Sequence, residues 1–180
     1  KNSFCKINYE FKMLRINRKY LIFFLLIFTF HFSLSYSQPL GNGKDGSPDI
    51  YGIINIYSPV TSDIYRCQKK ISVKNISGFS IGDLILIIQM QGTKINNSNT
   101  SDYGTVSDYC LSGNYEFARI DSIGTDNSVF IENPVLRNFS FNGKTQVIRV
   151  PQYDSPVISA TLTCKKWDGE TGGVLAFDAK

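Results

Sequence analysis

The sequence contains almost no histidine. Its single histidine, His31, lies among the first 37 residues, and none follows. Without an imidazole, the chain after residue 37 cannot form a Ser-His-Asp or Cys-His nucleophilic site, and it cannot bind zinc or iron through histidine. The commonest hydrolase designs are therefore excluded. We expect no enzymatic activity, no cofactor and no metal.

The chain also lacks an excess of positive charge outside its N-terminal part. Six of the 19 lysines and arginines, but only one of the 15 acidic residues, lie in residues 1–37. The remainder has 13 basic and 14 acidic residues, so the net charge of +4 belongs to the first 37 residues. Because nucleic-acid binding requires a basic surface, no nucleic-acid partner is expected.

A helical repeat is missing as well. From Gln38 onward, no segment repeats apolar residues at the spacing of about 3.6 that marks an amphipathic helix. Short runs of β-branched and aromatic residues alternate with Gly, Asn and Pro, which predicts an all-β fold, a small barrel more than a sandwich. Strands are expected over residues 51–57, 64–73, 84–90, 115–120, 128–132, 145–150, 157–163 and 173–177.

One of these runs is apolar at nearly every position. Residues 84–90 (LILIIQM) have almost no polar alternation and are too few for a typical helix. A turn at Gly82-Asp83 precedes them. We predict that this run is the central strand, buried on both faces.

The first 37 residues have the order of a secretory signal peptide. Basic residues precede an apolar run at residues 20–30, and the small residues Ser35 and Ser37 follow it. The alternatives are a retained membrane anchor, which needs about 20 apolar residues, and a buried helix. The expected division is upstream translated sequence at 1–12, a signal peptide at 13–37 and a mature chain from Gln38.

Composition divides the rest of the chain into three parts. Residues 38–49 (QPLGNGKDGSPD) have little to bury and predict a flexible linker. The alternative there is a calcium site on Asn42, Asp45 and Asp49, although the order of an EF-hand loop is absent. Residues 50–154 are expected to form the barrel or sandwich domain, and residues 155–180 to start a second β element, for which a β-solenoid is one candidate.

Three cysteines follow the predicted signal peptide, namely Cys67, Cys110 and Cys164. An exported protein meets oxidising conditions, so one disulfide among them, with one thiol left over, is one prediction. The other is that all three are unpaired and pack as small hydrophobic residues. The sequence leaves the three pairings open.

A long polar segment is the best candidate for a binding site. Residues 92–110 are rich in Asn, Ser, Thr and Asp, and loops of this length are functional or mobile. Tyr103, Tyr109 and Tyr115 lie in or beside it, and tyrosine combines apolar area with a hydrogen-bonding tip. They predict contact with carbohydrate or protein. The alternative is that they are half-buried core residues at strand ends.

One pair of acids deserves comparison with a glycosidase. Asp168 and Glu170 flank Gly169 beside Trp167, and paired carboxylates next to an aromatic ring are the groups that hydrolyse glycosidic bonds. The sequence WDGETGG is also typical of a turn in which acidic side chains accept backbone N–H groups. We predict the turn.

Four phrases of the chain, in this order and spacing, resemble the N-terminal region of large secreted proteins of gliding bacteria, which often end in a gliding-motility-associated or type IX secretion sorting domain. The resemblance covers about residues 43–180 and implies an adhesin-like module at the cell surface, with no catalytic residues to carry over. Cys164 departs from it, since a small residue is expected there. The phrases are GDLILIIQMQG (82–92), GNYEFARI (113–120), QVIRVPQY (146–153) and WDGETGGVLAF (167–177).

These observations favour a non-catalytic N-terminal module for adhesion or recognition, secreted or displayed on the outer cell surface. Its expected partner is a carbohydrate or a surface protein, and it meets the membrane only through the signal peptide during export. Two alternatives remain open: the leading domain of a β-helical polysaccharide-processing enzyme, and a structural cap of a β-solenoid.

Overall fold

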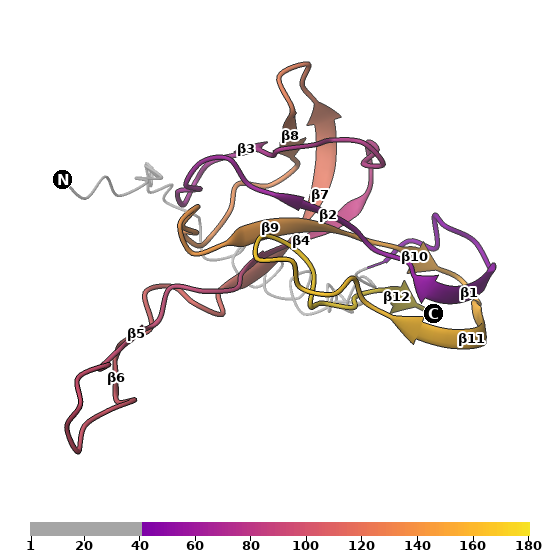
Figure 1. The fold of residues 1–180 in the computed structure, drawn as a ribbon. Coiled ribbons are helices and arrows are strands. Elements are labelled where there is room, and N and C mark those ends of the chain that lie inside the picture. The colour runs from indigo at the N-terminus through magenta and orange to yellow at the C-terminus, as the bar shows by residue number, and fades with distance from the viewer. Residues whose placement is uncertain (1–40) are drawn as a thin grey trace, which may run out of the picture. The chain divides into compact units, whose positions relative to one another are not determined.

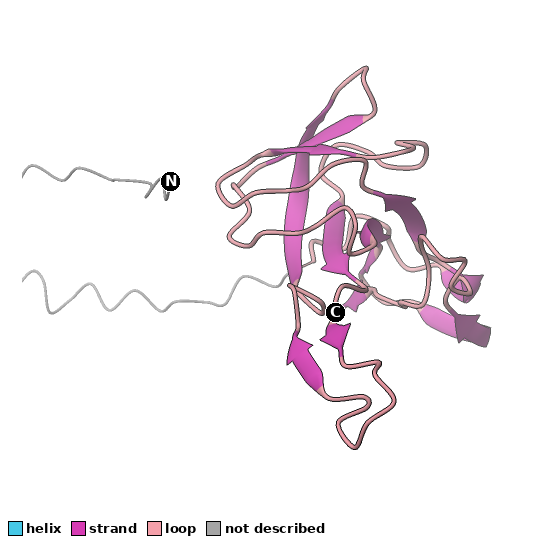
Figure 2. Ribbon diagram, turned by 60° about the vertical axis from the view of Figure 1, so that its left-hand side comes forward, coloured by secondary structure: helices cyan, strands magenta, loops and turns pink. Residues whose placement is uncertain are grey.

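The computed structural model describes residues 41–180, so the predicted upstream segment, signal peptide and start at Gln38 lie outside the described residues. Strands and loops make up this part of the chain (Figure 2), which confirms the all-β class. Among residues 41–180 there is no helix of the length and apolarity needed to cross a membrane. The strands are β1 (Asp49–Ile53), β2 (Ile56–Pro59), β3 (Lys70–Ser72), β4 (Leu84–Gln89), β5 (Lys94–Ile95), β6 (Val106–Asp108), β7 (Tyr115–Ile123), β8 (Ser128–Ile131), β9 (Thr145–Val150), β10 (Gln152–Tyr153), β11 (Val157–Thr163) and β12 (Asp178–Ala179).

Six strands form one curled antiparallel sheet in the order β2-β9-β4-β7-β8-β3 (Figure 1). The two edge strands approach each other where they end. Val60, directly after β2, forms an antiparallel bridge with Val73, directly after β3. Thr61 N donates to Ser72 O at 3.0 Å beside it. The sheet thus curls into a half-barrel, which we call the barrel.

The interior of the barrel is apolar because successive strand residues alternate between its two faces. On β4, Ile85 and Ile87 point inward and are fully buried. Burying each such side chain contributes about 1.5–3 kcal/mol of transfer free energy. The cluster that they join contains Val60, Ile64, Ile71, Val73, Phe79, Ile120, Val129, Ile131, Val135, Phe139 and Val147.

The outer face of β4 is buried as well. Leu84 and Leu86 pack with Ile148 and Val150 of β9 in a second cluster. The C-terminal segment 172–177 covers this cluster with Val174 and Ala176 and is held by polar side chains, including a pair of hydrogen bonds between Gln146 and Gly172 (3.0 and 2.9 Å). Strand β4 lies between β9 and β7. The prediction of a central strand buried on both faces is therefore confirmed.

Residues 41–49 differ from the flexible linker that we expected. The carboxylate of Asp45 accepts from the Arg149 guanidinium and from Gln152 N (2.7 Å). Asp45 N donates to Gln152 O at 2.9 Å. Of the three oxygen donors considered for calcium, Asp45 is engaged in these contacts and Asn42 Oδ1 accepts from Lys44 N at 3.0 Å. Polar groups hold this segment to the barrel. The prediction of a linker considered only how few apolar residues the segment contains, so it did not include these contacts.

Residues 155–180 also belong with the barrel, because residues 41–180 fall within one compact unit. Strand β11 pairs in parallel with β1, and β12 pairs in parallel with β10. Each pair joins segments that are far apart in the sequence. Their parallel direction contrasts with the antiparallel barrel.

Two predicted strands are shorter or absent. In the run 64–73 only β3 joins the barrel sheet, since the chain turns at Cys67, which adopts a left-handed φ of 72°. The run 173–177 is no strand, and the pairing residues are those of β12 just beyond it. Outside β3, both runs have apolar residues, such as Ile64 and Val174, that pack against the barrel without forming a regular ladder.

Candidate binding surface

Residues 92–110, which we call the arm, extend away from the barrel (Figures 1 and 2). Strands β5 and β6 of the arm pair only with each other, with an irregular register. All residues from 91 to 109 are exposed except Asn96, which is half-buried. The arm is thus the polar excursion that the sequence predicted, and it adds nothing to the core.

The base of the arm is fixed by Gln89, the last residue of β4. This side chain is fully buried, and its Nε2 donates to Cys110 O at 2.9 Å and to Gln91 O at 2.8 Å. Its Oε1 accepts from Ser140 N at 2.8 Å. Gln89 therefore joins both ends of the arm to the loop that precedes β9, and its own polar atoms are all satisfied.

The three predicted tyrosines are exposed but are not in one place. Tyr103, with 70% of its surface exposed, lies in the loop between β5 and β6. Tyr109, at 69%, follows β6, and Tyr115, at 58%, begins β7. Such exposure excludes the half-buried alternative. The tyrosines mark positions along the arm and at its junction with the barrel.

Tyr115 has an aromatic neighbour that the sequence analysis did not select. Its ring meets that of Phe117 edge-on, with centroids 6.3 Å apart and planes at 81°. Phe117 is 39% exposed. The alternation of residues 115–120 could have predicted this contact, because it places the rings of Tyr115 and Phe117 on one face of a strand.

Phe117 is exposed because the covering segment does not reach it. Residues 172–177 pack over β9 and β4, and Phe117 on the next strand, β7, is outside that cluster. Phe117 pairs with Leu86 across β4 and β7, so an exposed aromatic ring lies beside a buried leucine. The outer face of β7 is consequently an uncovered part of the barrel.

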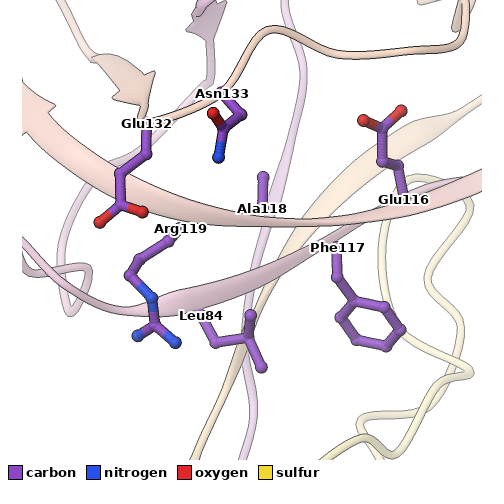
Figure 3. A pocket seen from close by; sticks show the side chains of 7 residues that line it. All are labelled: Leu84, Glu116, Phe117, Ala118, Arg119, Glu132 and Asn133. Carbon is purple, nitrogen blue, oxygen red and sulfur yellow. The ribbon is translucent and has the colours of Figure 1, made fainter. Parts of the chain in front are cut away.

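A pocket of about 170 Å³, which we call the β7 pocket, opens beside this face. Figure 3 shows Phe117, Arg119 and Leu84 on one side of the β7 ribbon, and Glu116, Glu132 and Asn133 on the other. The pocket therefore lies across an edge of β7. Its lining residues are Leu84, Glu116, Phe117, Ala118, Arg119, Glu132 and Asn133.

Two charged groups of the β7 pocket are already engaged. Both oxygens of Glu116 accept from Leu136 N, at 2.9 and 3.0 Å. The Arg119 guanidinium donates to Gly82 O at 2.8 Å and to Gln152 Oε1 at 3.2 Å. Glu132 and Asn133 instead extend their side chains from the segment after β8 toward the pocket (Figure 3).

The acid pair near Trp167 forms the turn that we predicted. Asp168 Oδ1 accepts from Glu170 N at 2.9 Å and from Thr171 N at 2.8 Å, and Lys165 Nζ lies 2.6 Å from Oδ2. The Lys165 ammonium and these backbone donors hold the pKa of Asp168 well below its usual range. Glu170 pairs with Lys74 at 3.0 Å. The Asp168 carboxylate therefore stays ionised at neutral pH and donates no proton.

The three cysteines are free thiols in the structure, but Cys67 is exposed and does not pack as a small hydrophobic residue. They follow different strands: Cys67 lies in the turn before β3, Cys110 at the end of the arm, and Cys164 after β11. At Cys110 a hydrogen bond to the Asp108 carboxylate raises the pKa of the thiol. The thiol form is therefore favoured over the reactive thiolate.

No family model matches the chain, and no curated protein matches it. Three phage tailspikes are similar to it in part. That of Acinetobacter baumannii bacteriophage AP22, solved in complex with A. baumannii capsular saccharide, is 16% identical with a TM-score of 0.40 over 62% of this chain and 17% of that chain. The tailspike of Pseudomonas phage phi297 is 12% identical (TM-score 0.37, 71% and 19%), and that of Pseudomonas phage LKA1 is 12% identical (TM-score 0.36, 66% and 20%). The chain spans a fifth or less of these tailspikes.

Proposed function

We propose that this chain is a non-catalytic recognition module of a secreted or surface-displayed bacterial protein. The observation that carries the proposal is the exposure of Tyr103 and Tyr109 on an arm that projects from a rigid barrel. Tyrosine gives large contact area at low conformational cost, and exposed aromatic residues are enriched where proteins bind partners. The resemblance to secreted proteins of gliding bacteria supports the same location and role.

The architecture separates recognition from stability. The arm makes its regular pairing only within itself, while Gln89 fixes its base with buried hydrogen bonds. The arm can therefore vary in sequence or adapt to a partner without disturbing the barrel. A loop of this kind on a rigid scaffold is a common arrangement for binding sites.

Replacing Tyr103 and Tyr109 together by alanine tests the proposal. We expect binding of the labelled chain to intact cells and to a glycan array to fall at least about tenfold, because two anchor rings are lost. Tyr65→Ala is the control, since Tyr65 is also largely exposed (57%) but lies between β2 and β3, outside the arm. Equal binding by the double variant and the parent would refute the proposal.

A second candidate function, the cap of a β-solenoid, is favoured by the parallel pairs β1–β11 and β10–β12. Strand β11 (VISATLT) has no charged residue, and Val157 and Ile158 are 58% and 59% exposed. The edge of this two-stranded sheet presents backbone N–H and C=O groups with which a further parallel strand could pair. In the full-length protein, Ile158→Lys should then lower the melting temperature by several degrees while leaving cell binding unchanged. An unchanged melting temperature would exclude the cap.

A further inference from the structure

We infer that the β7 pocket binds a single neutral sugar ring of an extracellular glycan. The inference rests on the proposed recognition function and goes beyond it by naming a ligand class and a second contact site. The site is on the barrel, whereas the proposed function rests on the arm.

The pocket exists because strand β8 stops short of the length of β7. β8 pairs with β7 only from Ile120 to Ile123, and the last contact is Glu132 N to Arg119 O at 3.0 Å. Pro134 then follows, and proline has no N–H to continue the ladder. The chain leaves β7 there, and Val135 inserts into the barrel core. The β7 edge at residues 116–118 is left without a strand partner on this side.

One side of this opening offers an aromatic surface. Phe117 is 39% exposed and is steadied by the edge of Tyr115, while Leu84 lies beside it in the pocket lining. The carbon-bound hydrogens of a pyranose ring carry a small positive charge. The negative face of an aromatic ring attracts them. The pocket volume of about 170 Å³ is smaller than the roughly 300–1,000 Å³ of sites for drug-sized ligands. It therefore suits one ring and not a longer segment.

The other side supplies hydrogen-bonding groups for hydroxyls. Glu132 offers a carboxylate with two acceptor oxygens, and Asn133 offers both a donor and an acceptor. A carboxylate can accept from two neighbouring hydroxyl groups at once. An apolar ring combined with a few such groups fixes the orientation of a polar ligand.

The charges in the lining select a neutral ligand. Two carboxylates, Glu116 and Glu132, face the pocket, and they repel an acidic sugar. The one cation of the lining, Arg119, already donates to Gly82 O and Gln152 Oε1. An anionic ligand would have to compete for those hydrogen bonds. Neutral hexoses and N-acetylhexosamines meet no such cost.

The test is a titration of the isotope-labelled exported chain with methyl glycosides, followed by the backbone amide signals. Methyl glycosides of glucose, galactose, mannose and N-acetylglucosamine are the neutral probes, and the methyl glycoside of glucuronic acid is the anionic probe. We expect at least one neutral probe to shift the amides of Phe117, Ala118 and Glu132. The glucuronide should bind roughly tenfold more weakly than the glucoside because of repulsion by the carboxylates.

Three variants make the assignment specific. Phe117→Ala should weaken binding of the neutral probe roughly tenfold, and Phe141→Ala, which removes a ring that is also exposed (46%) but outside the pocket, should leave it unchanged. Glu132→Gln keeps the shape of the side chain but removes its charge, so it should reduce the difference in affinity between the glucoside and the glucuronide. Thermal melts of all three variants verify that they fold.

The inference fails if no neutral glycoside shifts these amides, or if the glucuronide binds as well as the neutral glycoside that binds most tightly. If the arm variants lose cell binding but the sugars do not shift the amide signals of the pocket, the pocket inference fails and the proposed function of the arm stands. If the sugars bind at the pocket and the arm variants keep full cell binding, the pocket stands and the arm proposal fails.

Discussion

Arg149 Nε donates to Asp83 Oδ2 at 3.0 Å, and this ion pair joins strand β9 to the turn before β4. Asp83 is 1% exposed and precedes β4, while Arg149 lies near the end of β9 on the same face as the core residue Val147. Lys44 Nζ donates to the other oxygen of Asp83 at 2.9 Å. Residues 41–49 are therefore attached to the barrel through the buried carboxylate of Asp83.

Removing the charge of Asp83 should destabilise the fold. In Asp83→Asn the Arg149 guanidinium and the Lys44 ammonium lose the negative charge that they share and one of its two acceptor oxygens, and breaking a buried ion pair costs about 2–4 kcal/mol of unfolding free energy. Chemical denaturation measures this. Lys70→Gln is the control, since it breaks a pair whose side chains are about half exposed and should change stability by less than about 1 kcal/mol. Equal losses in the two variants would contradict a special role for Asp83.

The same contact predicts sensitivity to acid. Burial alone would raise the pKa of Asp83, but hydrogen bonds from Lys44, Arg149 and Ser80 N outweigh it, and the pKa lies below the ordinary value. A carboxyl with a depressed folded pKa stabilises the fold above the unfolded pKa of about 3.9, and that stabilisation is lost as the pH falls through the folded value.

Unfolding free energies of the parent and Asp83→Asn, measured from pH 7 to pH 2.5, test this linkage. Their difference should be constant above about pH 5 and shrink below about pH 4. Other carboxylates titrate in both proteins, so the difference isolates Asp83. A difference that stays constant over the whole range would show that Asp83 is not responsible.

Ile87→Asp should prevent folding. Ile87 is fully buried inside the barrel on the central strand, and an aspartate there would be an unpaired buried charge, which costs more than about 4 kcal/mol. Ile81→Asp is the matched control, because Ile81 lies three residues before β4 and is 64% exposed. Circular dichroism and thermal melts distinguish them. A cooperative melt of Ile87→Asp close to that of the parent would place β4 at an edge.

The parts of the fold that follow from local pattern could be predicted from the sequence. Residues 84–90 are apolar except for Gln89 because β4 has a core on each face, and the run 92–110 is polar because the arm touches no core. The turn at Asp168 follows from its own neighbours, which supply the N–H groups that it accepts.

Contacts between distant segments could not be predicted in this way. The order of residues 41–49 depends on Arg149 and Gln152, more than a hundred residues away, and composition alone indicates a linker. The β7 pocket depends on the point where β8 leaves β7, and Glu132 and Asn133 gain their place only from that pairing. The exposure of Phe117 depends on how far the C-terminal segment reaches.

Deleting residues 94–108 should leave the barrel intact and abolish binding by the arm. These residues pair only with one another and are almost wholly exposed, and the entropy of closing a loop changes little with its length, so the melting temperature should shift by no more than about 3 °C. Gln89→Ala keeps the arm but removes its buried anchor and leaves Ser140 N without its acceptor, and it should lower the melting temperature by at least about 4 °C. Calorimetry of the two variants, alongside binding to cells, separates stability from recognition. A deletion that destabilises the chain as much as Gln89→Ala would mean that the arm supports the barrel, and a deletion that keeps full binding would remove the arm from the recognition surface.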